Sequence, residues 1–126
     1  IKVCAVVMHQ VCHRFNDGEQ AYTPKDIHDV TKIPQQIINH AVKELLQAKL
    51  LVEIRSEKKG SFEESIILHP IEKIDHLTYG AMIERLFTYG ADVVGLAEQN
   101  PDWEKWKDID VLNAEFVESG KSINFV

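Results

Sequence analysis

The periodicity of apolar residues in the first half of the chain is the feature that most constrains its fold. Residues 1–16 carry apolar side chains every three or four positions, which predicts an amphipathic helix that ends before the Asp-Gly pair at 17–18. The Thr-Pro-Lys-Asp segment at 23–26 is typical of a helix start, with an N-cap hydroxyl, a proline and an early carboxylate. This second helix is expected to be short. A longer third helix with a wide apolar face is expected to open at Pro34.

A β-hairpin is expected directly after the third helix. The apolar or alternating runs 50–55 and 62–69 flank a polar turn at 58–61 and indicate two antiparallel strands. Lys49 lies between the helix and the first strand, where helices commonly end in a left-handed residue, so we expect a left-handed backbone there. Helix, short helix, longer helix and hairpin, in this order, are the elements of a winged helix-turn-helix, which would occupy residues 1–76.

Residues 77–126 are expected to form a helical extension. Leu77 and Thr78 indicate a helix start and Gly90 a stop, and the helix between them has an apolar stripe made of Tyr79, Met82, Ile83, Leu86 and Phe87. We expect this stripe to lie either in the core or at a symmetric dimer or partner contact. A last helix is expected after residue 100, with aromatic and apolar residues at helical spacing that favour packing within the chain: Trp103, Trp106, Ile109, Leu112 and Phe116. The expected fold class is therefore α+β, mainly helical: a winged helix-turn-helix with a hairpin wing and a C-terminal helical extension.

The sequence contains no recognisable catalytic constellation, and we expect no cofactor or metal. His9 and His13 have the spacing of two zinc ligands on one helix face and Cys12 is adjacent, but no third ligand is evident. Eight residues separate Cys4 from Cys12 on one helix, about 12 Å, so these thiols cannot form a disulfide with each other. Unpaired, apolar-flanked thiols favour a reducing compartment such as the cytosol.

The third helix offers candidate nucleic-acid contacts. Amide and basic side chains that could read bases early on this helix are Gln35, Gln36, Asn39, His40 and Lys43. Phosphate contacts would fall to Lys58 and Lys59 of the wing, with Lys25, Lys32 and Arg55.

The charge balance argues against nucleic acid as the main partner. The net charge is -6, and the acidic excess lies in the extension, which has 9 acidic and 4 basic residues against 11 and 10 in residues 1–76. Negative charge opposes the attraction that supplies most nonspecific nucleic-acid affinity, and the third helix has no arginine. The sequence therefore favours a protein-interaction module over a DNA-binding one.

Short motifs spread over most of the chain resemble the cytoplasmic C-terminal region of YihY/BrkB-type membrane proteins, long labelled ribonuclease-BN-like. They are Cys12-His13-Arg14-Phe15, Tyr22-Thr23, Ile33-Pro34, Glu44-Leu45-Leu46-Gln47-Ala48, Leu77-Thr78 and Leu86 through Gly90. In that family a multi-helix membrane domain precedes such a tail, so the resemblance implies a cytoplasmic domain tethered to the inner membrane. The start at Ile1, without an initiator methionine, fits an excised tail.

The family resemblance and the winged-helix order of elements are compatible with two functions of different classes. One is a non-catalytic regulatory or interaction domain, whose partner would be a protein or the family's own membrane domain. The other is a DNA-binding regulator similar to the MarR type, which commonly has glycine where this chain has Lys49. The ribonuclease label implies no catalytic residue here, because no metal-ligand or acid-base set accompanies the motifs.

Overall fold

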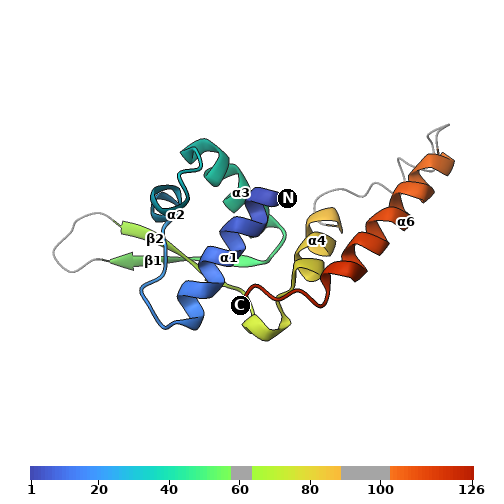
Figure 1. The fold of residues 1–126 in the computed structure, drawn as a ribbon. Coiled ribbons are helices and arrows are strands. Elements are labelled where there is room, and N and C mark those ends of the chain that lie inside the picture. Colours follow the sequence, from blue (N-terminus) through green and yellow to red (C-terminus); the bar gives the residue numbers. More distant parts are fainter. Residues whose placement is uncertain (58–63, 89–102) are drawn as a thin grey trace.

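The structure is a computed structural model that describes residues 1–57, 64–88 and 103–126 (Figure 1). For 56–57, 64–65 and 103–107 it describes the backbone only. The elements are α1 (Lys2–Asn16), α2 (Pro24–Thr31), α3 (Gln35–Gln47), β1 (Leu51–Glu57), β2 (Glu64–Pro70), the 3-10 helix η1 (Ile74–His76), α4 (Tyr79–Thr88) and α6 (Trp103–Gly120). The expected α+β, mainly helical class is confirmed.

One hydrophobic core unites the N-terminal helices, the hairpin and the start of the extension. The apolar stripe of α1 is buried as Cys4, Val7, Met8, Val11 and Cys12, and α3 contributes Ile38, Ala41, Val42 and Leu45. Leu50, Leu51 and Leu68 of the hairpin region and Leu77, Met82 and Ile83 of the extension belong to the same cluster. The boundary expected at residue 76 is therefore not a gap between two cores.

The hairpin pairs β1 with β2 antiparallel, from Leu51 opposite Pro70 to Glu57 opposite Glu64. A third segment joins its edge, because the backbone N–H of Leu68 donates to the carbonyl of Tyr22 at 3.0 Å. The link between α1 and α2 is thereby tied to β2.

Most helix ends in the described part of the chain follow the local signals, whereas the stop expected at Gly90 and the start expected after residue 100 lie outside the described residues. The Thr23 hydroxyl accepts from the Asp26 N–H at 3.1 Å and the Asp26 carboxylate accepts from the Thr23 N–H at 2.9 Å, which is a complete capping box. Lys49 has φ 57, so the expected left-handed residue after α3 is confirmed. The expectation that α3 opens at Pro34 is wrong by one residue, because Pro34, with ψ 139, is the N-cap and the helix starts at Gln35.

The extension is held together by a close helix crossing and by the C-terminal tail. A Cβ atom placed on Gly80 of α4 would lie 2.4 Å from the carbonyl oxygen of Val117 in α6, so only glycine permits this approach. Beyond α6, the Tyr79 N–H donates to the Ile123 carbonyl at 2.9 Å, and the buried Phe125 ring stacks on Tyr79 with centroids 4.3 Å apart. Figure 1 shows the far end of α6 projecting away from the rest of the molecule.

Candidate functional site

The exposed face of α3 carries the candidate base-reading side chains. Gln36, Asn39, His40 and Lys43 are exposed and Gln35 is half-buried. The Gln35 amide donates to the Asn39 side-chain oxygen at 2.8 Å. Lys25, Lys32 and Arg55 are also exposed, whereas Lys58 and Lys59 lie outside the described residues.

Acidic side chains lie close to some of these candidate contact residues. Lys43 and Asn39 share a surface hollow with Glu53 of β1, and His40 lies 3.2 Å from the Glu44 carboxylate. Asp29 of α2 is exposed as well. Because a phosphate backbone approaching α3 would meet carboxylates beside Lys43 and His40, this part of the face offers little net attraction to nucleic acid.

The described residues contain no group suited to metal-dependent chemistry. The rings of His9 and His13 lie 4.2 Å apart between centroids, but no third His, Cys, Asp or Glu joins them within the described part of the chain. Burial raises the pKa of the Cys12 thiol to about 12. Burial and the hydrogen bond to Glu44 raise that of Cys4 to about 11, so both thiols stay protonated and unreactive.

The apolar stripe of α4 divides between the core and the surface. Met82 and Ile83 are buried within the chain, and Tyr79 packs on Phe125, so these three face inward. Leu86 is half-buried and Phe87 is 39% exposed. Only the end of this stripe is therefore open to a ligand or partner.

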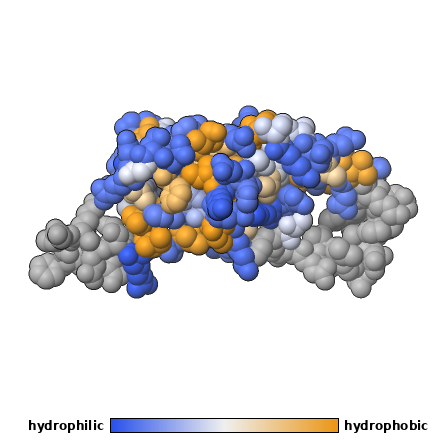
Figure 2. All heavy atoms as spheres, turned by 90° about the horizontal axis from the view of Figure 1, so that it is seen from below, coloured by the Kyte–Doolittle hydropathy of each residue, from blue (hydrophilic) through white to orange (hydrophobic). Residues whose placement is uncertain are grey.

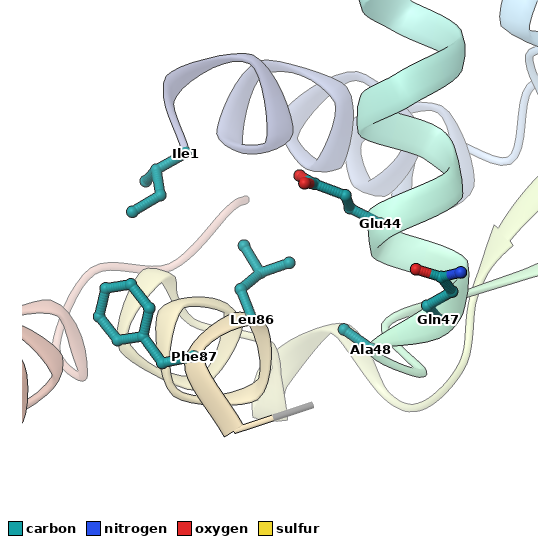
Figure 3. A pocket seen from close by; sticks show the side chains of 6 residues that line it. All are labelled: Ile1, Glu44, Gln47, Ala48, Leu86 and Phe87. Atoms are coloured by element: carbon teal, nitrogen blue, oxygen red, sulfur yellow. The ribbon is translucent and has the colours of Figure 1, made fainter. Parts of the chain in front are cut away.

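A pocket of about 300 Å³ lies where the start of α1, the end of α3 and the end of α4 meet (Figure 3). Leu86 and Phe87 line it together with Ile1, Glu44, Gln47 and Ala48. Figure 3 shows Glu44 of α3 and Leu86 of α4 directed into the same gap. The sequence contains no signal for this pocket, since its walls come from three segments that are far apart along the chain.

The helix α6 presents an apolar ridge made of Ile109, Leu112 and Phe116, which are 51%, 64% and 47% exposed. Their i, i+3, i+7 spacing places them on one face, next to the face that packs on α4 through the buried Val117 and Gly120. The expectation that this stripe packs within the chain is wrong for these three residues. The side chains of Trp103 and Trp106, which share the stripe, lie outside the described residues.

The ridge is one of several exposed apolar features. Seen from below, a mostly hydrophilic surface is interrupted by apolar patches (Figure 2). Phe15 and Ile54 of the N-terminal part are 50% and 40% exposed. What distinguishes α6 is that its apolar residues form a continuous ridge on one long helix.

Comparison with models of known protein families and with curated proteins finds no match. No helix within the described residues is both long enough and apolar enough to cross a membrane.

Proposed function

We propose that this chain is a non-catalytic interaction domain built on a winged-helix scaffold. The order α1, α2, α3, β1, β2 supports that scaffold, and the Tyr22–Leu68 hydrogen bond joins the α1–α2 link to the hairpin. Among the described residues, the buried and protonated thiols and the absence of a metal-binding cluster give no support to a catalytic role.

The observation that carries the proposal is the apolar ridge of Ile109, Leu112 and Phe116. Each side chain leaves about half of its surface in water, on a helix of 18 residues whose other face is already packed on α4. Exposed apolar side chains that line up along a helix are typical of a surface that docks another protein segment.

The net charge of α6 indicates which kind of partner the ridge can bind. Asp108, Asp110, Glu115 and Glu118 are exposed on this helix. Lys121 pairs with Glu118 at 3.0 Å, and over its whole length the sequence of α6 has five acidic residues against two basic ones, Lys105 and Lys107. The net negative charge of this helix disfavours nucleic acid, anionic lipid and a second copy of the helix as partners. A basic amphipathic helix complements both its apolar and its charged character, and we infer that this is the partner.

The resemblance to YihY/BrkB-type proteins gives this partner a natural source. Cytoplasmic loops of membrane proteins are enriched in lysine and arginine near the membrane. A cytoplasmic tail with an apolar ridge on an acidic helix would dock on such loops of its own membrane domain. On this proposal the domain acts in regulation or assembly, and the ribonuclease label describes nothing that this chain does.

A designed helical peptide of leucine and lysine tests the ridge, with a leucine and glutamate peptide of the same length as its counterpart. We expect the basic peptide to bind and the acidic one not to bind. Leu112→Ser should weaken binding about tenfold, the loss typical of a central apolar contact. Val111→Ser is the matched control, because Val111 is 58% exposed but lies on a different face of α6.

Three results would overturn the proposal. Equal affinity for the two peptides would show that charge does not select the partner. An equal loss of peptide affinity in Val111→Ser and Leu112→Ser would show that the ridge is not the binding surface. A dimer in sedimentation that Leu112→Ser dissociates would make a second copy the occupant.

The alternative function, a DNA-binding regulator, is favoured by the exposed Gln36, Asn39 and Lys43. We expect duplex DNA to bind weakly and without sequence preference, because the Glu53 carboxylate shares a hollow with Asn39 and Lys43. Binding measured at two salt concentrations decides between the functions. Tight and sequence-selective binding would favour the regulator.

A further inference from the structure

The pocket between α1, α3 and α4 has the dimensions of a small-molecule site. Its volume of about 300 Å³ is at the lower end of the range of ligand pockets, roughly 300 to 1,000 Å³. Its walls come from the N-terminal helices and from the extension, so a bound molecule would touch both (Figure 3).

The lining of the pocket is apolar on one side and acidic on the other. Ile1, Leu86 and Phe87 supply aliphatic and aromatic surface, while α3 supplies the carboxylate of Glu44 and the amide of Gln47. None of these lining residues is a lysine or an arginine. The pocket therefore pairs hydrophobic walls with a single anionic group.

Among the described residues, no lysine or arginine forms an ion pair with the Glu44 carboxylate. One carboxylate oxygen lies 3.2 Å from the His40 ring, and the other accepts a hydrogen bond from the Cys4 thiol at 3.5 Å. The Cys4 thiol is neutral, because its pKa is raised to about 11.

We infer that this pocket binds a small organic cation with an aromatic or aliphatic tail, such as an aryl or alkyl ammonium compound. The cationic group would lie at the Glu44 carboxylate, and the Phe87 ring would add a cation–π contact. The tail would cover Leu86 and Ile1. A neutral apolar ligand would strip water from the carboxylate without replacing its interactions, and an anion would be repelled.

Such a ligand would act as a clamp between the two parts of the molecule. It would contact α3 through Glu44 and Gln47 and α4 through Leu86 and Phe87, so binding would stabilise the docked arrangement of the extension. The inference does not depend on the ridge of α6, because none of the ridge residues lines this pocket.

Titration with benzyltrimethylammonium, followed by amide NMR shifts, tests the site. Benzyl alcohol and phenylacetate are the neutral and anionic probes of similar size. We expect the cation to shift the amides of Glu44, Gln47, Ala48 and Leu86, and the other two probes to bind several-fold more weakly. Equal binding of benzyl alcohol, or shifts that lie elsewhere, would overturn the inference.

Variants of single glutamates test whether the Glu44 carboxylate binds the cation. Glu44→Gln should weaken binding of the cation by roughly fivefold, as expected for a partly exposed ion pair, and Glu84→Gln should not. Glu84 is the matched control, since it is exposed on α4 and does not line this pocket. An equal loss in both variants would indicate diffuse attraction and overturn the site. If Glu44→Gln does not fold, Leu86→Trp provides the test, because the larger side chain fills the pocket. Loss of cation binding in Leu86→Trp would support the site, and retained binding would overturn it.

Discussion

Replacing Gly80 with alanine tests how closely α4 and α6 approach each other. The added Cβ would lie 2.4 Å from the Val117 carbonyl oxygen, 2.6 Å from the Lys121 nitrogen and 2.9 Å from the Gly120 carbonyl carbon. All three are backbone atoms, so no side chain can rotate away. The end of α6 and the tail that follows it would have to move.

The expected magnitude is the difference between two opposing effects. Alanine is favoured over glycine inside a helix by about 1 kcal/mol, so propensity alone predicts a more stable protein. Overpacking of a close contact costs about 1 to 3 kcal/mol, and backbone contacts belong at the upper end of that range. We therefore expect Gly80→Ala to lower the free energy of unfolding by about 2 kcal/mol.

Urea unfolding measures this change directly. With a denaturant slope of about 1 to 3 kcal/mol per molar, the midpoint should fall by roughly 1 M. Gly120→Ala should behave in the same way, because its Cβ would lie 2.8 Å from the Gly80 nitrogen. Ser119→Ala, on the exposed side of the same turn, is the control and should change stability by less than about 0.5 kcal/mol. Unchanged or raised stability in Gly80→Ala would refute the close crossing.

Two further predictions concern titratable groups of α1. With pKa values of about 11 and 12, Cys4 and Cys12 should resist alkylation at pH 8 in the native protein and react fully in urea, and rapid native labelling would contradict their burial. Partial burial and the neighbouring His13 lower the pKa of His9 below its ordinary 6.5, so the unfolded chain takes up the proton more readily. Stability should therefore fall as the pH drops below about 6.5. The melting temperature of His9→Gln should depend less on pH over this range, and an identical pH dependence would contradict the assignment.

The features that the sequence predicted correctly are those decided by neighbouring residues. The capping box of Thr23 and Asp26 needs only four consecutive residues, and so does the cap of α4, where the Thr78 hydroxyl accepts from the Ala81 N–H at 3.1 Å. The left-handed conformation of Lys49 is predictable because the apolar periodicity changes from that of a helix to that of a strand at this position. Local hydrogen-bonding options settle such positions before any tertiary contact forms.

The features that escaped prediction depend on residues far apart in the chain. The tail beyond residue 119 shows no periodicity, yet Phe125 is fully buried because α1 and Tyr79 lie beside it in space. The pocket needs the starts and ends of three helices at once. No single segment contains a signal for either feature.

Periodicity also identifies a face without identifying what covers it. Leu45 and Ile37 both belong to the apolar pattern of α3, but Leu45 is fully buried and Ile37 is 46% exposed. The ridge of α6 is a second example, because its apolar residues have the spacing of a packed helix but remain exposed to water. Whether an apolar face meets its own core or a partner is decided by topology, which the pattern does not encode.

Replacing Lys49 with glycine tests the turn that joins α3 to the hairpin. The Lys49 N–H donates to the Leu46 carbonyl at 3.1 Å, and the Leu50 N–H donates to the Leu45 carbonyl at 3.0 Å, which is the hydrogen-bond pattern of a Schellman motif. The residue at this position has φ 57, where a side chain is strained by about 1 to 2 kcal/mol.

Glycine removes this strain but adds about 0.5 to 1 kcal/mol of unfolded-chain entropy, so Lys49→Gly should raise the free energy of unfolding by up to about 1 kcal/mol. Gln47→Gly, two residues earlier and inside the helix, should instead lower it by about 0.5 to 1 kcal/mol. Lys49→Ala keeps the strain without the charge and should leave stability nearly unchanged. The opposite signs of the two glycine variants are the decisive outcome in urea unfolding. A loss in Lys49→Gly as large as that in Gln47→Gly would mean that α3 continues through this position, and the hairpin would then not begin at Leu51.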